Sequence, residues 1–192
     1  MNQEISNFCT SWLTKSRTYD SNNLQGAFDK FFTLFVVYNR LYVELTFRLS
    51  NKGLINLINR KTFPDANAAK VYSVEYLTST VLNNAFDSSP DCLIAIEELK
   101  NIIRNNTFNI KLNMVTGVPM PDKDSDLLSA LESSNTANRM KAITDYLYSV
   151  RCNTFHAQKG YTNDQIELLR PICILLEKII ELIFDKLRNE PD

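Results

Sequence analysis

Residues 23–50 of the chain read NLQGAFDKFFTLFVVYNRLYVELTFRLS, a stretch rich in aromatic residues. Its large apolar residues recur at steps of three and four, the spacing that places side chains on one face of an α-helix. Gly53 follows closely and suits the C-terminal cap of such a helix. The stretch predicts a long central helix with a wide apolar face, formed by Phe28, Phe31, Phe32, Phe35, Tyr38, Tyr42 and Leu45.

The composition of the whole chain also favours an all-α fold. Of 192 residues, 44% are hydrophobic, and there are only four glycines and six prolines. Long stretches of helix-forming residues therefore run without the frequent turns of a β-sandwich. The length suits one domain over residues 1–192, with a substantial hydrophobic core.

Four further helices are predicted after the first, over residues 65–86, 87–106, 136–158 and 166–187. The last two flank residues 162–165, TNDQ, which fit a capping box in which Thr162 and Gln165 bond to each other's backbone amides. Pro171 lies inside the last helix and should kink it or shift its first turn. The short connection predicts that these two helices form an antiparallel hairpin.

Residues 107–125 break the helical pattern. They alternate apolar and polar residues, contain Gly117, Pro119 and Pro121, and then become acidic. We interpret this segment as an irregular insertion, with a short strand as one option, and as the main mobile loop of the chain.

The charge and the cysteines exclude some classes of protein. A net charge of -1 excludes a globally basic nucleic-acid binder, so an anionic partner would need a local cluster of cations. The four cysteines are far apart and there is one histidine, so neither a zinc site nor a cofactor is predicted. Since no stretch reads as a signal peptide or membrane span, we expect a cytoplasmic protein with reduced thiols.

The single histidine lies in YSVRCNTFHAQKGY, residues 148–161. On a helix, Arg151 and His156 would be roughly 140° apart, so they would need a loosened helix end or a second copy of the chain to meet at one phosphate. A neutral imidazole could take the proton of a ribose 2′-hydroxyl while an arginine holds the phosphate, which suits cleavage of RNA but not of DNA. The other reading is a histidine that only caps a helix or lies on the surface, and spacing does not decide between them.

The wording VRCNTFHAQKGY resembles the signature of HEPN domains, an Arg-x4-6-His motif with a polar residue soon after the arginine. The earlier run FFTLFVVYNRLYVE resembles the early-helix pattern of the same family through Asn39 and Tyr42. The resemblance covers about residues 24–60 and 135–188, and it departs from the usual glycines at Ala157 and Gln158. The matching motif residues are Val150, Arg151, Asn153, Phe155, His156 and Lys159.

This resemblance implies an HEPN-like antiparallel helical bundle with an irregular insertion around residues 107–125. It also implies a metal-independent endoribonuclease of a toxin–antitoxin, abortive-infection or other antiviral system, in which Arg151 and His156 are catalytic and Asn153 supports them. The expected partners are RNA, a second copy of the chain in a homodimer, and an antitoxin or other regulatory protein. Two alternatives stay open: an inactive HEPN fold that binds RNA, a nucleotide or a protein, and an unrelated helical adaptor.

Neighbouring residues are assigned supporting roles. Lys159 and Arg40 are candidates for further phosphate contacts, although each is equally well explained as a solvated surface charge. Tyr161 could stack on an unpaired base or pack over the hairpin. Asn39 is expected to be a buried amide that orients the motif helix, and Tyr42 to support it.

Overall fold

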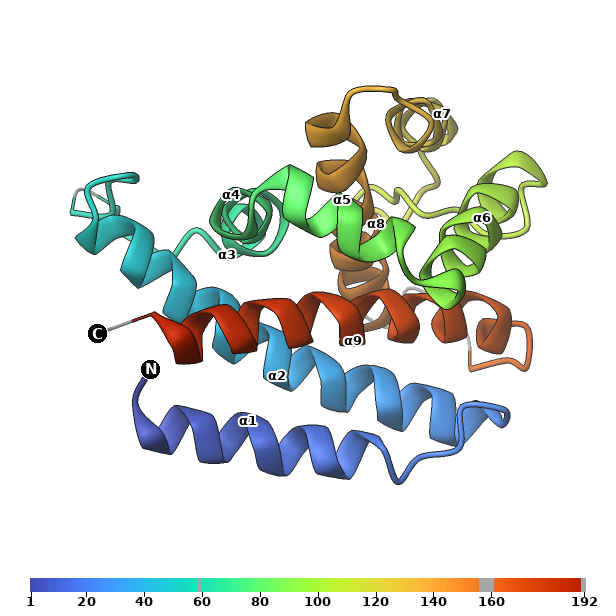
Figure 1. The fold of residues 1–192 in the computed structure, drawn as a ribbon. Coiled ribbons are helices and arrows are strands. Elements are labelled where there is room, and N and C mark those ends of the chain that lie inside the picture. Colours follow the sequence, from blue (N-terminus) through green and yellow to red (C-terminus); the bar gives the residue numbers. More distant parts are fainter. Residues whose placement is uncertain (59, 156–160, 191–192) are drawn as a thin grey trace.

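The computed structural model describes residues 1–58, 60–155 and 161–190, and these residues form an all-α fold (Figure 1). Among them no strand is formed, and the nearest approach to one is an isolated bridge between Leu112 and Pro119. The helices are α1 (Gln3–Ser16), α2 (Leu24–Asn51), α3 (Asp65–Asn67), α4 (Ser73–Leu77), α5 (Ser79–Asp87), α6 (Pro90–Arg104), α7 (Pro121–Leu131), α8 (Thr136–Phe155) and α9 (Gln165–Asn189), with a π-helical turn, η1 (Ala68–Tyr72), between α3 and α4.

Helix α2 is the centre of the fold, as the aromatic stretch predicted. Asn23 caps it by accepting a hydrogen bond from the backbone amide of Gly26, and Gly53 follows it with a positive φ of 71°. Its buried aromatic rings meet edge to face, with centroids about 5 to 6 Å apart, in the order Phe31, Phe35, Tyr38 and Tyr42.

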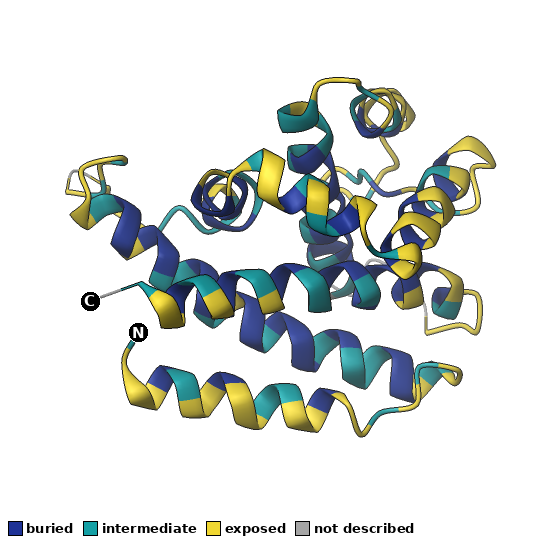
Figure 2. Cartoon of the chain, in the orientation of Figure 1, coloured by how far each residue is buried: buried dark blue, intermediate teal, exposed yellow. Residues whose placement is uncertain are grey.

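Helices α2 and α9 pack against each other, with α1 on α2 and α6 on α9. The other helices cover the opposite side of α9 from α1, where α8 packs on η1, α5 and α7 (Figure 1). The buried hydrophobic residues of this arrangement form one core within the described residues. Figure 2 shows the buried positions in dark blue along the helices. Among these residues, no helix combines the length and the apolar character required to cross a bilayer.

The helix expected over residues 65–86 is broken. Thr78 has φ 71° and ψ 140°, so α4 ends there, and its hydroxyl oxygen accepts a hydrogen bond from the amide of Val81 at the start of α5. A positive φ is a strained conformation for a β-branched residue such as threonine, so local propensity does not predict a break here. Packing of both short helices on the core, with Leu77 and Leu82 buried, compensates for this strain.

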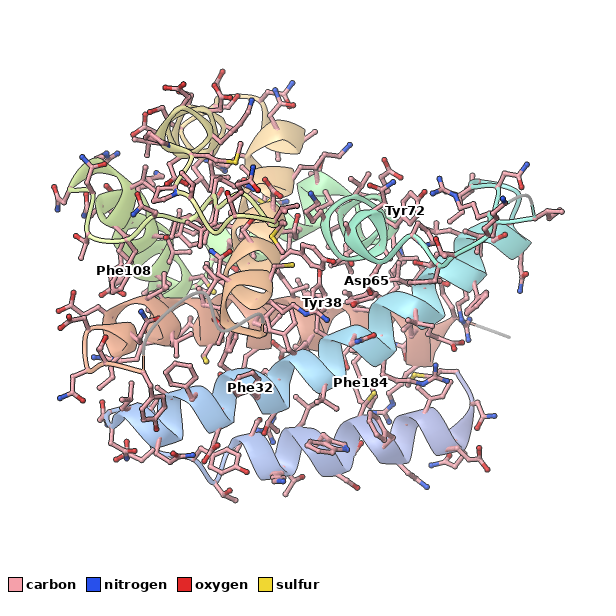
Figure 3. All side chains as sticks on the ribbon, turned by 180° about the vertical axis from the view of Figure 1, so that it is seen from behind. Phe32, Tyr38, Asp65, Tyr72, Phe108 and Phe184 are labelled. Atoms are coloured by element: carbon pink, nitrogen blue, oxygen red, sulfur yellow. The ribbon has the colours of Figure 1, made fainter. Side chains whose placement is uncertain are left out.

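The predicted antiparallel hairpin of the last two helices is not formed. In the described residues, α8 runs across the direction of α9 instead of alongside it, in both views of the molecule (Figures 1 and 3). The apolar face of α9 is instead covered mainly by α2 and α6. Two helices that are adjacent in sequence therefore pack against different elements, α9 on α2 and α6, and α8 on η1, α5 and α7.

The capping box at residues 162–165 is also absent. Asp164 occupies the N-cap position and makes no side-chain capping bond, while the amide of Gln165 donates to the backbone oxygen of Thr162 at 3.0 Å. A capping box requires its threonine at the N-cap, and here the helix begins two residues too late for that. Helix α9 then continues through Pro171.

The predicted irregular insertion at 107–125 is shorter than expected, because α7 already begins at Pro121. Proline suits the first position of a helix, and the acidic residues Asp122 and Asp124 are favourable in its first turn. The acidic run that suggested a loop is therefore a helix start.

Candidate functional site

Arg151 lies near the end of α8 and lines a cleft of about 390 Å³. The opposite wall is formed by η1 and by the irregular segment before α7. We call this hollow the Arg151 cleft, and its lining residues are Lys70, Ile110, Lys111, Leu112, Met114, Asp145, Tyr148, Ser149, Arg151, Cys152 and Asn153.

The Arg151 cleft carries more positive than negative charge. Its one lining carboxylate, among the described residues, is that of Asp145, which pairs with Lys70 Nζ at 3.1 Å and with Lys111 Nζ at 2.5 Å. Lys111 also donates to the hydroxyl of Ser149 at 2.8 Å. Two lysines and Arg151 thus face a single aspartate, and the cleft suits an anionic ligand.

The guanidinium of Arg151 rests on an aromatic ring. Its Cζ lies 5.7 Å from the ring centre of Tyr148, and its Nη1 lies 3.9 Å from Cys152 Sγ. Partial burial would lower the pKa of Arg151, but the contact with Cys152 and the nearby Tyr148 and Tyr42 hydroxyls raise it above its ordinary value. The group is therefore charged at any physiological pH and is held by a cation–π contact.

Asp65 connects Tyr148 to the central helix. Its carboxylate accepts hydrogen bonds from the hydroxyls of Tyr42, at 2.6 Å, and Tyr148, at 2.8 Å. Burial and then this shared carboxylate raise the pKa of both tyrosines. Figure 3 shows Asp65 between α2 and the coil of α3 and α4. Through this shared carboxylate, Tyr42 helps to hold the ring on which Arg151 rests.

Asn153 forms part of the cleft wall. It is buried, and its Nδ2 donates to the backbone oxygen of Ile110 at 2.9 Å. From the other side, the carboxylate of Asp124 accepts from the amides of Ile110, at 3.0 Å, and Lys111, at 2.8 Å. Together these bonds fasten the irregular segment to α8 and α7, which positions Lys111 in the cleft.

Replacing Asn153 by alanine should destabilise the fold by about 1–3 kcal/mol, because the buried oxygen of Ile110 loses its partner. Urea unfolding followed by circular dichroism measures this. Asn138→Ala, at an exposed position of the same helix, is the matched control and should change stability by less than about 0.5 kcal/mol. Equal unfolding midpoints for the two variants would contradict the role assigned to this bond.

The structure does not bring all the predicted site residues together. His156 and Lys159 lie outside the described residues. Arg40 lies two residues before Tyr42, which turns it to the other side of α2, where it approaches Glu44 at 4.0 Å and lowers the pKa of Cys9 in α1 against the larger raising effect of burial.

Asn39 is exposed, so the prediction of a buried amide is wrong. It lies between Tyr38 and Tyr42 in sequence but is turned away from the face that these two tyrosines share. Tyr161 is 56% exposed, donates to Gln25 Oε1 at 2.8 Å and has its ring centre 4.9 Å from that of Phe28. It thus packs at the start of α2, beside a separate hollow of about 280 Å³.

Sequence reasoning missed Lys70, Lys111, Asp145 and Asp65 as site residues. None belongs to the motif, and their partners are between 23 and 83 residues away along the chain. Within the described residues, no group of three or more His, Cys, Asp or Glu side chains is arranged to hold a metal ion.

Comparisons of the chain with protein-family models, with curated proteins and with solved structures found no match.

Proposed function

We propose that this protein is a metal-independent endoribonuclease of the HEPN type, which acts as a homodimer. The observation that carries the proposal is the placement of Arg151. Its guanidinium rests on Tyr148 in a cationic cleft beside Lys70 and Lys111, five residues before the single histidine of the chain.

In the proposed reaction, Arg151 binds the non-bridging oxygens of a phosphate and stabilises the charge that grows on them. The imidazole of His156 takes the proton of the adjacent ribose 2′-hydroxyl, whose oxygen attacks the phosphorus. The bond from phosphorus to the 5′-oxygen breaks, and the partner subunit's His156 gives that oxygen a proton. The products are a 2′,3′-cyclic phosphate and a 5′-hydroxyl.

The homodimer is part of the proposal because one chain carries one histidine, while the reaction needs both an acceptor and a donor of protons. In a homodimer, residues from both chains can also line one cleft, so Arg151 and His156 need not share one face of a helix. Within the same proposal, the protein is a cytoplasmic toxin or antiviral effector that a regulatory protein restrains, and Lys159 contacts the RNA.

The second candidate is an HEPN fold that binds RNA, a nucleotide or a protein without cleaving. The hydrogen bond from Asn153 to the backbone oxygen of Ile110 favours this candidate, because the amide group of this motif residue is engaged in a structural contact of the cleft wall. The same cationic cleft would then hold phosphates without reaction.

The test is incubation of the purified protein with single-stranded RNA in excess EDTA. We expect cleavage of the RNA to continue in EDTA, and a DNA strand of the same sequence, which lacks the 2′-hydroxyl, to stay intact. The His156→Ala variant should cleave the RNA at least about a hundredfold more slowly. Loss of activity in EDTA, or full activity of His156→Ala, would contradict the proposed mechanism. Binding of RNA with no cleavage would favour the second candidate.

A further inference from the structure

A second, larger hollow adjoins the Arg151 cleft. It has a volume of about 700 Å³, lies among α7, α8, η1 and the irregular segment before α7, and we call it the α7–α8 cleft. It shares part of its lining with the Arg151 cleft, so the two are neighbours on one surface. The shared residues are Lys70, Lys111, Leu112 and Asp145.

The α7–α8 cleft is lined by apolar and by cationic side chains. Its apolar side chains, which we call the floor, include Val71, Leu112, Met120 and Leu127. Its two lysines beyond the shared ones, Lys123 and Lys141, we call the rim lysines. Its volume is in the range of pockets that enclose small organic ligands. A flat apolar group with an anionic group on either side would match this pattern.

The charge of this surface is opposite to that of the chain. Among the described residues that line the two clefts there are five cations and two carboxylates, whereas the whole chain has a net charge of -1. Within the described residues, the rim lysines form exposed ion pairs, Lys123 with Asp126 at 3.1 Å and Lys141 with Glu75 at 3.5 Å. Exposed pairs contribute little, so a phosphate can replace the carboxylate at each lysine.

We propose that the α7–α8 cleft is a subsite for one unpaired nucleotide of an RNA strand, next to the phosphate held by Arg151. The base lies against the apolar floor, and its flanking phosphates contact the lysines of the rim. Only an unpaired base can enter, because the bases of a duplex are stacked inside the helix. This inference rests on the proposed function and adds the form of RNA that the enzyme takes.

Binding is separated from cleavage by the use of a short 2′-O-methyl RNA strand, which lacks the attacking hydroxyl. Fluorescence anisotropy of the labelled strand should give a Kd about tenfold weaker for Lys123→Glu and for Lys141→Glu, with a shallower dependence on salt. Ser129→Trp, at an exposed position of α7 that lines the cleft, should also weaken binding by filling it. Lys15→Glu is the matched control, because Lys15 is an exposed residue of α1 and this helix lies across the molecule from α7 (Figure 1), so its Kd should equal that of the parent.

Two further strands test the role of the base. The same strand paired with its complement, and a strand with abasic sites, should both bind more weakly than the single strand. Equal binding of the abasic strand, or parental affinity of Lys141→Glu and Ser129→Trp together, would overturn the subsite. If the variants bind more weakly than the parent but the parent cleaves no RNA, the subsite is upheld and the nuclease is rejected. If the parent cleaves RNA and the variants of the rim lysines bind and cleave it normally, the nuclease is upheld and the subsite is rejected.

Discussion

Replacing Arg151 by alanine should lower the rate of RNA cleavage at least about a hundredfold, the typical effect of removing one group that stabilises charge in a transition state. The loss follows from its place in the Arg151 cleft, where the guanidinium of this motif residue lies against the ring of Tyr148. Arg151→Lys should recover only part of the rate, since an ammonium keeps the charge but not the planar fork. Single-turnover cleavage of a labelled RNA measures both effects.

Arg40→Ala is the matched control for this experiment. It removes the same side chain from the opposite side of α2, away from the Arg151 cleft, and the cleavage rate should not change. Circular dichroism of each variant shows whether it remains folded. Parental activity in a folded Arg151→Ala protein would remove the basis of the proposed reaction.

Replacing Ile179 by aspartate should destabilise the protein by several kcal/mol. Ile179 is completely buried in α9, and a carboxylate there would lose its hydration without gaining a partner. Because a whole domain is stabilised by only about 5–15 kcal/mol, we expect a fall of about 10 °C or more in Tm, or failure to fold at 37 °C. Thermal unfolding followed by circular dichroism measures it.

Ile94→Asp makes the same chemical change on α6 at a side chain that is 58% exposed, and Tm should stay within about 2 °C of the parent. If Ile179→Asp melted within about 2 °C of the parent, as this control should, the buried face of α9 would be assigned to the wrong residues. A stability loss in both variants would instead place Ile94 in an interface between chains.

The sequence predicted well those helices whose apolar residues repeat over several turns. The long aromatic stretch became α2, the helix predicted over residues 87–106 became α6, which begins at Pro90, and the helix predicted from residue 136 became α8. The stripe of Met140, Ile143, Leu147 and Val150 along α8 is buried. The break at Thr78 was missed, because a strained residue is stabilised by packing that no local pattern contains.

The candidate site was predicted only in the part that one helix supplies. The motif identified Arg151 and Asn153, but Lys70, Lys111 and Asp65 reach α8 from other elements. The crossing of α8 over α9 leaves the sides of α8 open to η1 and α7, and this brings the lysines in. A side-by-side hairpin, as expected from the sequence, would place different residues around Arg151.

By itself, the sequence determined the all-α class, the central helix and the motif at the end of α8, because helical periodicity and the order of motif residues depend on neighbours a few positions apart. The tertiary structure alone decided which cations share a cleft with Arg151 and which carboxylate holds Tyr148 beneath it. Those contacts depend on the angles at which helices pack, and these angles are set by side chains from distant parts of the chain.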